Sequence, residues 1–108
     1  MAASSPGTHA ERLREAARRL VDAVVEGPAA ATPAARRAAF AGRSDDPAVA
    51  RYVGIVRRHA YRVTDGDVER LRGAGLEDDA IFELTVAAAL GAGMERLRSG
   101  LSQLGREP

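Results

Sequence analysis

Residues 60–101 read AYRVTDGDVERLRGAGLEDDAIFELTVAAALGAGMERLRSGL, and this stretch decides the fold. It contains a short helical segment that begins after Thr64, a break at Gly75, and a longer helix that follows the break. From Leu84 to Met94 this last helix has no charged residue. Because a helix that is apolar all round is usually buried all round, we expect the segment to be covered on every side.

A chain of 108 residues has few helices of its own with which to cover such a segment. We therefore expect a homo-oligomer whose interface includes the helix from Leu84 to Met94. Gly91 and Gly93 each cost about 1 kcal/mol relative to Ala inside a helix, so both predict close contact with a neighbour. An Arg in place of Ala89 should split the oligomer.

The remainder of the chain predicts more helices and no strand, since no useful stretch alternates with period two. We therefore expect an all-α fold. Thr8 with Glu11 forms a capping-box pattern, and Gly27-Pro28 ends the helix that it starts. Thr32-Pro33 and Asp46-Pro47 are two further start signals, each with a capping side chain followed by proline.

Two apolar stripes predict which sides of these helices are buried. The first helix has one stripe along its length, and the helix after Asp46 has another. Their members are Leu13, Ala16, Ala17, Leu20, Val21 and Val24 in the first helix, and Val49, Tyr52, Val53, Val56 and Ala60 in the other.

Composition excludes several function classes. The 16 Arg and 15 acidic residues nearly cancel, so the charge gives no reason to expect a nucleic acid or membrane partner. There is no Cys, which excludes thiolate catalysis and thiolate metal ligands. We expect a single helical domain over residues 1–108 with residues 1–7 flexible. The start of the chain resembles no secretory signal, so a cytoplasmic location is the expectation.

The segment from about Val49 to Leu104 resembles the alkylhydroperoxidase-D-like and carboxymuconolactone decarboxylase superfamily, and the resemblance implies that residues 47–104 form the core of that fold. Its peroxidase members carry a Cys-x-x-Cys pair, a His four residues later, and a Gly-Leu helix start about eight residues after that His. Counting back from Gly75 places Ala60, Val63 and Asp67 at the first Cys, the second Cys and the His. The resemblance thus implies an oligomeric helical bundle with a degenerate active site and no thiol peroxidase activity.

The register of that centre also selects the candidate site residues. His59, Tyr61 and Asp67 are the candidate catalytic groups, because an imidazole or carboxylate can move a proton and a phenol can donate to an oxyanion. The ligand-binding candidates, which could hold a small carboxylated molecule, are Tyr52, Arg58 and Arg62. We expect these side chains to border one pocket or an intersubunit seam. Structural roles compete with this interpretation, since Asp67 also fits a helix N-terminus and His59 the edge of an apolar stripe.

Three functions follow as hypotheses. The first is a non-peroxidatic helical protein that acts as an oligomeric structural or small-ligand-binding protein. The second is a Cys-independent enzyme of the carboxymuconolactone decarboxylase type. The third is a nucleic-acid-binding regulator, which has the least support because the Arg pairs are scattered and no recognition motif accompanies them. No cofactor is expected, and no metal site, because the acidic clusters fit helix caps better than ligand loops.

Overall fold

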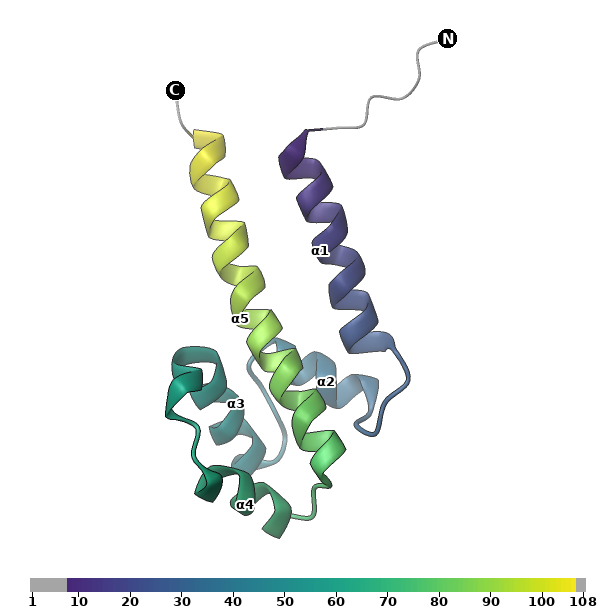
Figure 1. The fold of residues 1–108 in the computed structure, drawn as a ribbon, viewed down its shortest axis with the longest axis vertical. Coiled ribbons are helices and arrows are strands. Elements are labelled where there is room, and N and C mark those ends of the chain that lie inside the picture. Colours follow the sequence, from purple (N-terminus) through teal and green to yellow (C-terminus); the bar gives the residue numbers. More distant parts are fainter. Residues whose placement is uncertain (1–7, 107–108) are drawn as a thin grey trace.

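The computed structural model describes residues 8–106, and every regular element in that range is helical, which confirms the all-α prediction. The expected flexible residues 1–7 lie outside the described range. In chain order the elements are α1 (His9–Glu26), α2 (Pro33–Phe40), α3 (Pro47–His59), the 3₁₀ turn η1 (Ala60–Arg62), α4 (Asp65–Gly73) and α5 (Asp78–Arg106) (Figure 1).

The first three helices begin where the sequence predicts. The Thr8 hydroxyl accepts a hydrogen bond from the amide of Glu11, and the Glu11 carboxylate accepts from the amide of Thr8, which completes a capping box. The Thr32 hydroxyl caps α2 by accepting from the Ala35 amide, and the Asp46 carboxylate caps α3 by accepting from the Ala48 amide. Each cap is followed by proline in the first helical turn. Local chemistry alone therefore sets these boundaries.

The break between α4 and α5 is a helix-ending turn built on Gly75. This residue has a φ of +98°, which a side chain would strain. The Leu76 amide donates to the Leu71 carbonyl at 3.1 Å, and the Gly75 amide donates to the Arg72 carbonyl at 2.9 Å. The turn redirects the chain so that α5 can pass back across α2 and α3.

The core lies where α2, α3 and α4 pack against residues 78–92 of α5, and we call this part the bundle. Ala39 from α2, Val53 from α3 and Ala87 from α5 have no exposed surface. The other buried apolar members are Ala31, Val49, Tyr52, Val56, Leu71, Ile81, Leu84 and Ala88. Most of the predicted stripe of α3 is therefore buried, but Ala60 lies beyond the end of α3 and is exposed.

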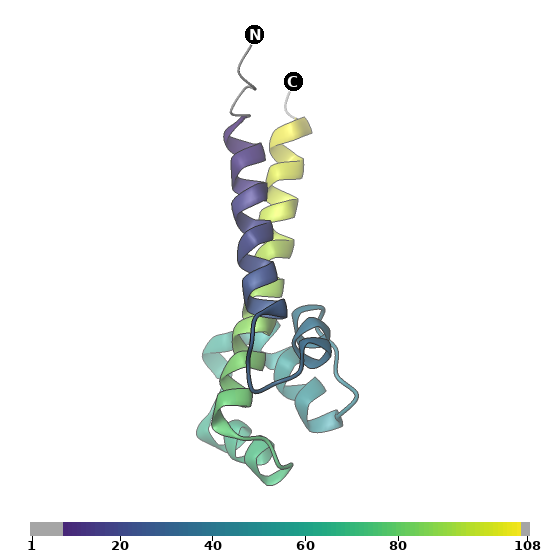
Figure 2. The same cartoon turned by 90° about the vertical axis from the view of Figure 1, so that its right-hand side faces the viewer.

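A second part of the molecule projects from the bundle. Here α1 and residues 93–106 of α5 run antiparallel and side by side in both views, and we call this pair the arm (Figures 1 and 2). Figure 2 shows α2, α3 and α4 gathered around the first part of α5, below the arm. Each helix of the arm is covered along one side by the other.

The prediction of a fully buried stripe on α1 is wrong. Val25 is buried and Val21 and Val24 are partly buried, but Leu13 is 52% exposed and Leu20 is 50% exposed. The physical reason is that the stripe is wider than one neighbouring helix can cover. Leu13, Ala16 and Leu20 are therefore exposed in the single chain.

Within the single chain α5 is buried on one side only from Leu84 to Met94, so the prediction that a partner subunit covers the rest stays a prediction. Leu84, Ala88 and Gly91 are buried against the bundle, whereas Ala89 is exposed. A Cβ on Gly91 would overlap the carbonyl oxygen of Phe40, so the predicted close contact exists at that glycine. No atom lies within 4 Å of a Cβ placed on Gly93, so the same prediction fails there within the single chain.

Candidate functional site

Tyr52, a candidate ligand-binding residue, has its hydroxyl inside the core. The side chain is 4% exposed, and its hydroxyl lies 2.7 Å from the hydroxyl of Thr85 on α5. Because the Thr85 hydroxyl donates to the Ile81 carbonyl at 2.6 Å, the proton between Tyr52 and Thr85 comes from Tyr52. This hydrogen bond connects α3 to α5, and it uses the only proton that the Tyr52 hydroxyl could donate to a ligand.

His59 and Tyr61 lie at the exposed end of α3 and in η1. Tyr61 is 80% exposed, and its hydroxyl is 3.4 Å from His59 Nδ1, too long for a strong hydrogen bond. The two rings meet edge to face at 5.7 Å, and the Arg62 guanidinium lies 5.8 Å from the Tyr61 ring centre. These three side chains meet because they are neighbours in sequence, and no other described element encloses them.

Asp67 is a helix cap. Its carboxylate accepts from the Thr64 amide at 3.0 Å and from Arg70 at 2.8 Å, while its own amide donates to the Thr64 hydroxyl at 3.2 Å. The hydrogen bond from the Thr64 amide, helped by the Thr64 hydroxyl and Arg70, holds the pKa of Asp67 below its usual value. A carboxylate held in its charged form in this way suits a capping role better than proton transfer near neutral pH.

The candidate residues therefore do not border one cavity of the single chain, so the prediction of a shared pocket is wrong, and the alternative of an intersubunit seam stays a prediction. His59 and Arg58 line an open hollow with Arg57, Glu95 and Arg96, whereas Tyr52 and Asp67 line a separate and much smaller one between α3 and α4. The Arg58 guanidinium lies back along its own helix, next to Gly54. Sequence spacing grouped these residues, but they lie at two different places along α3, one next to α4 and the other next to α5.

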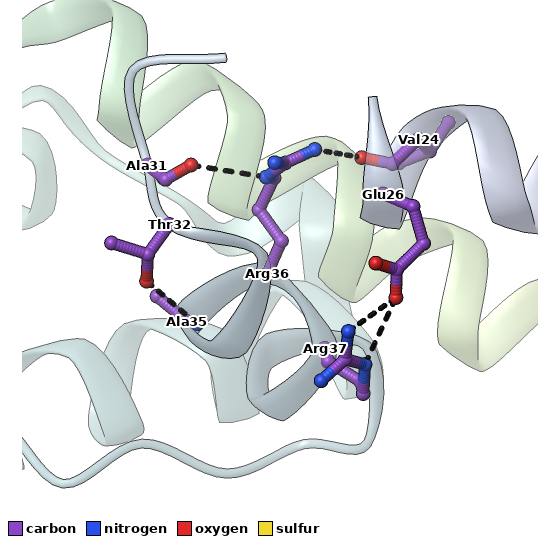
Figure 3. A network of polar contacts seen from close by, with 7 residues as sticks. All are labelled: Val24, Glu26, Ala31, Thr32, Ala35, Arg36 and Arg37. Carbon is purple, nitrogen blue, oxygen red and sulfur yellow. Dashed lines mark hydrogen bonds and ion pairs between the residues drawn. The ribbon is translucent and has the colours of Figure 1, made fainter. Parts of the chain in front are cut away.

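The structure instead brings together Arg36 and Glu83, which the sequence reasoning did not select. Arg36 is 2% exposed, and its guanidinium donates to the Ala31 carbonyl at 3.1 Å and to the Val24 carbonyl at 2.9 Å (Figure 3). From α5, the Glu83 carboxylate accepts from the amides of Ala31 at 2.7 Å and Ala30 at 3.0 Å. We call this arrangement the linker clamp, because both residues hold the segment between α1 and α2.

The electrostatics of the linker clamp are those of a structural element. The amide of Ala31, and then that of Ala30, lower the pKa of Glu83, and the positive charge of Arg36 adds to the effect. Figure 3 shows that the neighbouring Arg37 points away from Arg36 toward Glu26, with which it pairs. Across the described residues, no buried side-chain nitrogen or oxygen lacks a hydrogen-bond partner. The clamp therefore fixes the direction in which α1 leaves the bundle.

The arm contains a hollow of about 560 Å³ between α1 and α5. Its apolar lining comes from both helices and from Phe40 at the end of α2, and three arginines contribute to its wall. The lining residues are Arg14, Ala17, Arg18, Val21, Phe40, Met94, Leu97, Arg98, Leu101 and Ser102. An apolar floor with guanidinium groups could accommodate a small molecule that carries a carboxylate.

The described part of the chain has no group of three or more His, Asp or Glu side chains that could hold a metal ion. None of its helices is both long and apolar enough to cross a bilayer. No protein-family model, curated protein or solved structure matches the chain.

Proposed function

We propose that this protein is a non-peroxidatic, alkylhydroperoxidase-D-like helical protein that works as a homo-oligomeric structural or small-ligand-binding subunit. The observation that carries the proposal is the uncharged segment of α5 from Leu84 to Met94. One side of this segment is buried in the bundle, while Ala89 is exposed and Val86 and Gly93 are only partly covered. Phe82, just before the segment, is 69% exposed.

The free energy gained by burying exposed apolar side chains supports a homo-oligomer. Burying a large apolar side chain is favourable by roughly 1.5–3 kcal/mol, and a domain of ordinary size is stable by only about 5–15 kcal/mol. Leu13, Leu20, Phe82 and Leu104 are each at least half exposed in the single chain. Covering these side chains in an oligomer would therefore add a stabilisation comparable to that of the fold.

The ligand-binding part of the proposal rests on the hollow in the arm. Arg14, Arg18 and Arg98 contribute to its wall, and no carboxylate does. Arg18 already pairs with Glu15, which leaves Arg14 and Arg98 as the better candidates for an anionic group. A small carboxylated molecule with an apolar body has the matching chemistry.

The enzyme alternative has less support. A decarboxylase-type site would need His59 and Tyr61 to face a substrate in a place that excludes water, and both side chains are exposed. The nucleic-acid alternative has still less, since many of the arginines are paired with carboxylates, as Arg18, Arg37 and Arg72 are. A structural or ligand-binding subunit is the better proposal.

The test is the substitution Ala89→Arg, with Ala34→Arg on the exposed surface of α2 as the matched control. We expect light scattering to show an oligomer for the wild type and the control, and an 11.4 kDa monomer for Ala89→Arg. Circular dichroism should be unchanged, because Ala89 is exposed in the single chain and the new charge stays in water. A wild-type chain that is monomeric at micromolar concentration would refute the proposal.

A further inference from the structure

A continuous uncharged stripe runs along α5 on the side that the bundle leaves open. At about 100° per residue, positions spaced by three and four residues share one side of a helix. Phe82 and Leu104, near the two ends of the stripe, are 69% and 70% exposed. The whole stripe is Phe82, Val86, Ala89, Gly93, Leu97, Gly100 and Leu104.

The outward-facing residues of α1 lie on the same side of the arm. The hollow between the helices identifies the sides that face each other, namely that of Leu101 on α5 and that of Val21 on α1. On each helix the exposed stripe is rotated by about 90° around the helix axis from the side that faces the other helix. On both helices this rotation is in the sense in which residue numbers decrease. Two antiparallel helices turn in opposite senses when viewed from one end, so the two stripes point the same way.

We call this combined surface the open face. On α1 it comprises Leu13, Ala16 and Leu20, and on α5 it comprises the seven residues of the stripe. Leu84, Ala88 and Gly91, which are buried against the bundle, lie on the opposite side of α5 from the stripe.

The size of the open face matches a small but specific protein interface. The stripe on α5 spans 22 residue steps, or about 33 Å, and each helix is about 10 Å wide with its side chains. The α1 part of the open face, from Leu13 to Leu20, spans 7 residue steps, or about 10 Å, so the two parts together give roughly 430 Å² per subunit, or about 870 Å² when both partners are counted. That area is in the range of weaker specific complexes.

The charges along α5 favour a second copy of the same helix in the antiparallel direction. Its first two turns carry Asp78, Asp79 and Glu83 and no arginine, whereas its distal half carries Arg96, Arg98 and Arg106 against a single acid, Glu95. Antiparallel pairing brings the acidic end of each α5 toward the basic end of the other and also opposes the helix dipoles. Parallel pairing would place the acidic ends together.

The side-chain sizes along the stripe locate the crossing point. Helices that cross at an angle are closest at one point and separate on either side of it. Gly93 is the central residue of the stripe, and the largest side chains, Phe82 and Leu104, lie at its two ends. With the crossing at Gly93, Ala89 faces the partner's Leu97, Val86 faces the partner's Gly100, and Phe82 faces the partner's Leu104.

We propose that two copies of this chain pair through the open face, with α5 antiparallel to α5 and the two-fold axis at Gly93. The inference rests on the proposed function and adds to it the surface, the orientation and the register. Paired in this way, the two arms form an antiparallel four-helix assembly in which the exposed leucines of α1 flank the α5 pair.

Cysteine cross-linking tests the register, because the chain has no cysteine of its own. Gly93→Cys places a thiol on the two-fold axis, and Gly73→Cys is the matched control on α4, since a Cβ at either glycine has no atom within 4 Å. Under mild oxidation Gly93→Cys should form a disulfide-linked dimer on the order of 100-fold faster than the control. The reason is that thiols held in an interface experience a millimolar effective concentration in place of a micromolar one.

The orientation has its own test. Leu104→Cys alone should form no rapid cross-link, whereas the double variant Phe82→Cys with Leu104→Cys should cross-link rapidly, because antiparallel pairing joins position 82 of one copy to position 104 of the other. Rapid linkage by Leu104→Cys alone would indicate parallel helices and overturn the proposal.

Light scattering on the uncross-linked wild type separates the two levels of the argument. A monomeric wild type would overturn both the proposed function and this inference. This holds even where a different protein binds the open face, because the proposed partner is a second copy of the chain. An oligomer in which Gly93→Cys links no faster than Gly73→Cys would overturn the inference alone. An odd number of subunits would exclude the two-fold pairing.

Discussion

The bundle and the arm use the same kinds of residue but differ in how fully they are covered. In the bundle, Leu84, Ala87 and Ala88 of α5 are buried by α2 and α3. In the arm, one side of α5 meets α1, while Gly100 and Leu104 remain exposed. One helix thus runs from a region where it is covered by three other helices into a region where it is covered by one, and the uncovered side is the surface on which we propose that a second copy packs.

The strongest test of this contrast compares two glycines on the same turn of α5. In Gly91→Ala the added methyl group would overlap the Phe40 carbonyl and approach the Arg57 guanidinium, so α2 and α5 would have to separate. We expect a loss of about 3 kcal/mol in the free energy of unfolding. Gly93→Ala adds the same group where no atom of the same chain lies within 4 Å, so in the Ala89→Arg background, which removes the pairing of two copies, it should change the stability by less than about 1 kcal/mol.

Chemical denaturation of both variants at neutral pH measures the difference. Equal losses for Gly91→Ala and Gly93→Ala would mean that the bundle and the arm are packed alike, contrary to the comparison.

The second test breaks the connection between the two regions. Arg36→Met keeps an unbranched side chain of similar size but removes the donors to the carbonyls of Val24 and Ala31. Leaving two largely buried carbonyls without these partners should cost about 2 kcal/mol. Arg37→Met, one residue later, removes only an exposed ion pair with Glu26 and should cost no more than about 0.5 kcal/mol.

Thermal unfolding of these two adjacent variants gives the comparison directly, and hydrogen exchange shows where the change occurs. Faster exchange in α1 of Arg36→Met, with the centre of α3 unchanged, is the expected pattern. A loss of protection spread evenly over α1 and α3 would show that the linker clamp does not separate the arm from the bundle.

The sequence predicted those parts of the fold that depend on neighbouring residues. Thr8 with Glu11, Asp46 with Pro47, and Gly75 each act within a few positions, so their capping and turn chemistry can be read directly. Burial depends on distant partners and was predicted less well. The stripe of α1 indicated an apolar side but not that a single helix would face it.

The candidate site shows the same limit. Tyr52 and His59 lie on one helix, and only the position of α5 determines that the first enters the core while the second stays at the surface. Arg36 sits beside Arg37 in an ordinary Arg-Arg pair, and no local signal distinguishes the buried residue from the exposed one. Its partners are carbonyl groups, which every residue has, so the linker clamp has no sequence motif.

The smallest expected effect is a pH-dependent one at the α5 side of the linker clamp. The amides of Ala31 and Ala30 hold the pKa of Glu83 below its ordinary value of 4.5. A carboxylate whose pKa is lowered by folding stabilises the folded state fully above its unfolded value, and that contribution disappears as the pH falls through the folded value. In Glu83→Gln one oxygen still accepts a hydrogen bond, but the negative charge is gone. The wild type should therefore melt above the variant at pH 7, and the gap should narrow below pH 4.5 and close in stronger acid. Because both proteins share every other titrating group, the difference between their melting curves isolates Glu83. A gap that stays constant down to pH 3, or one that widens in acid, would mean that the charge of Glu83 does not hold the linker to α5, and that shape alone keeps the arm in place.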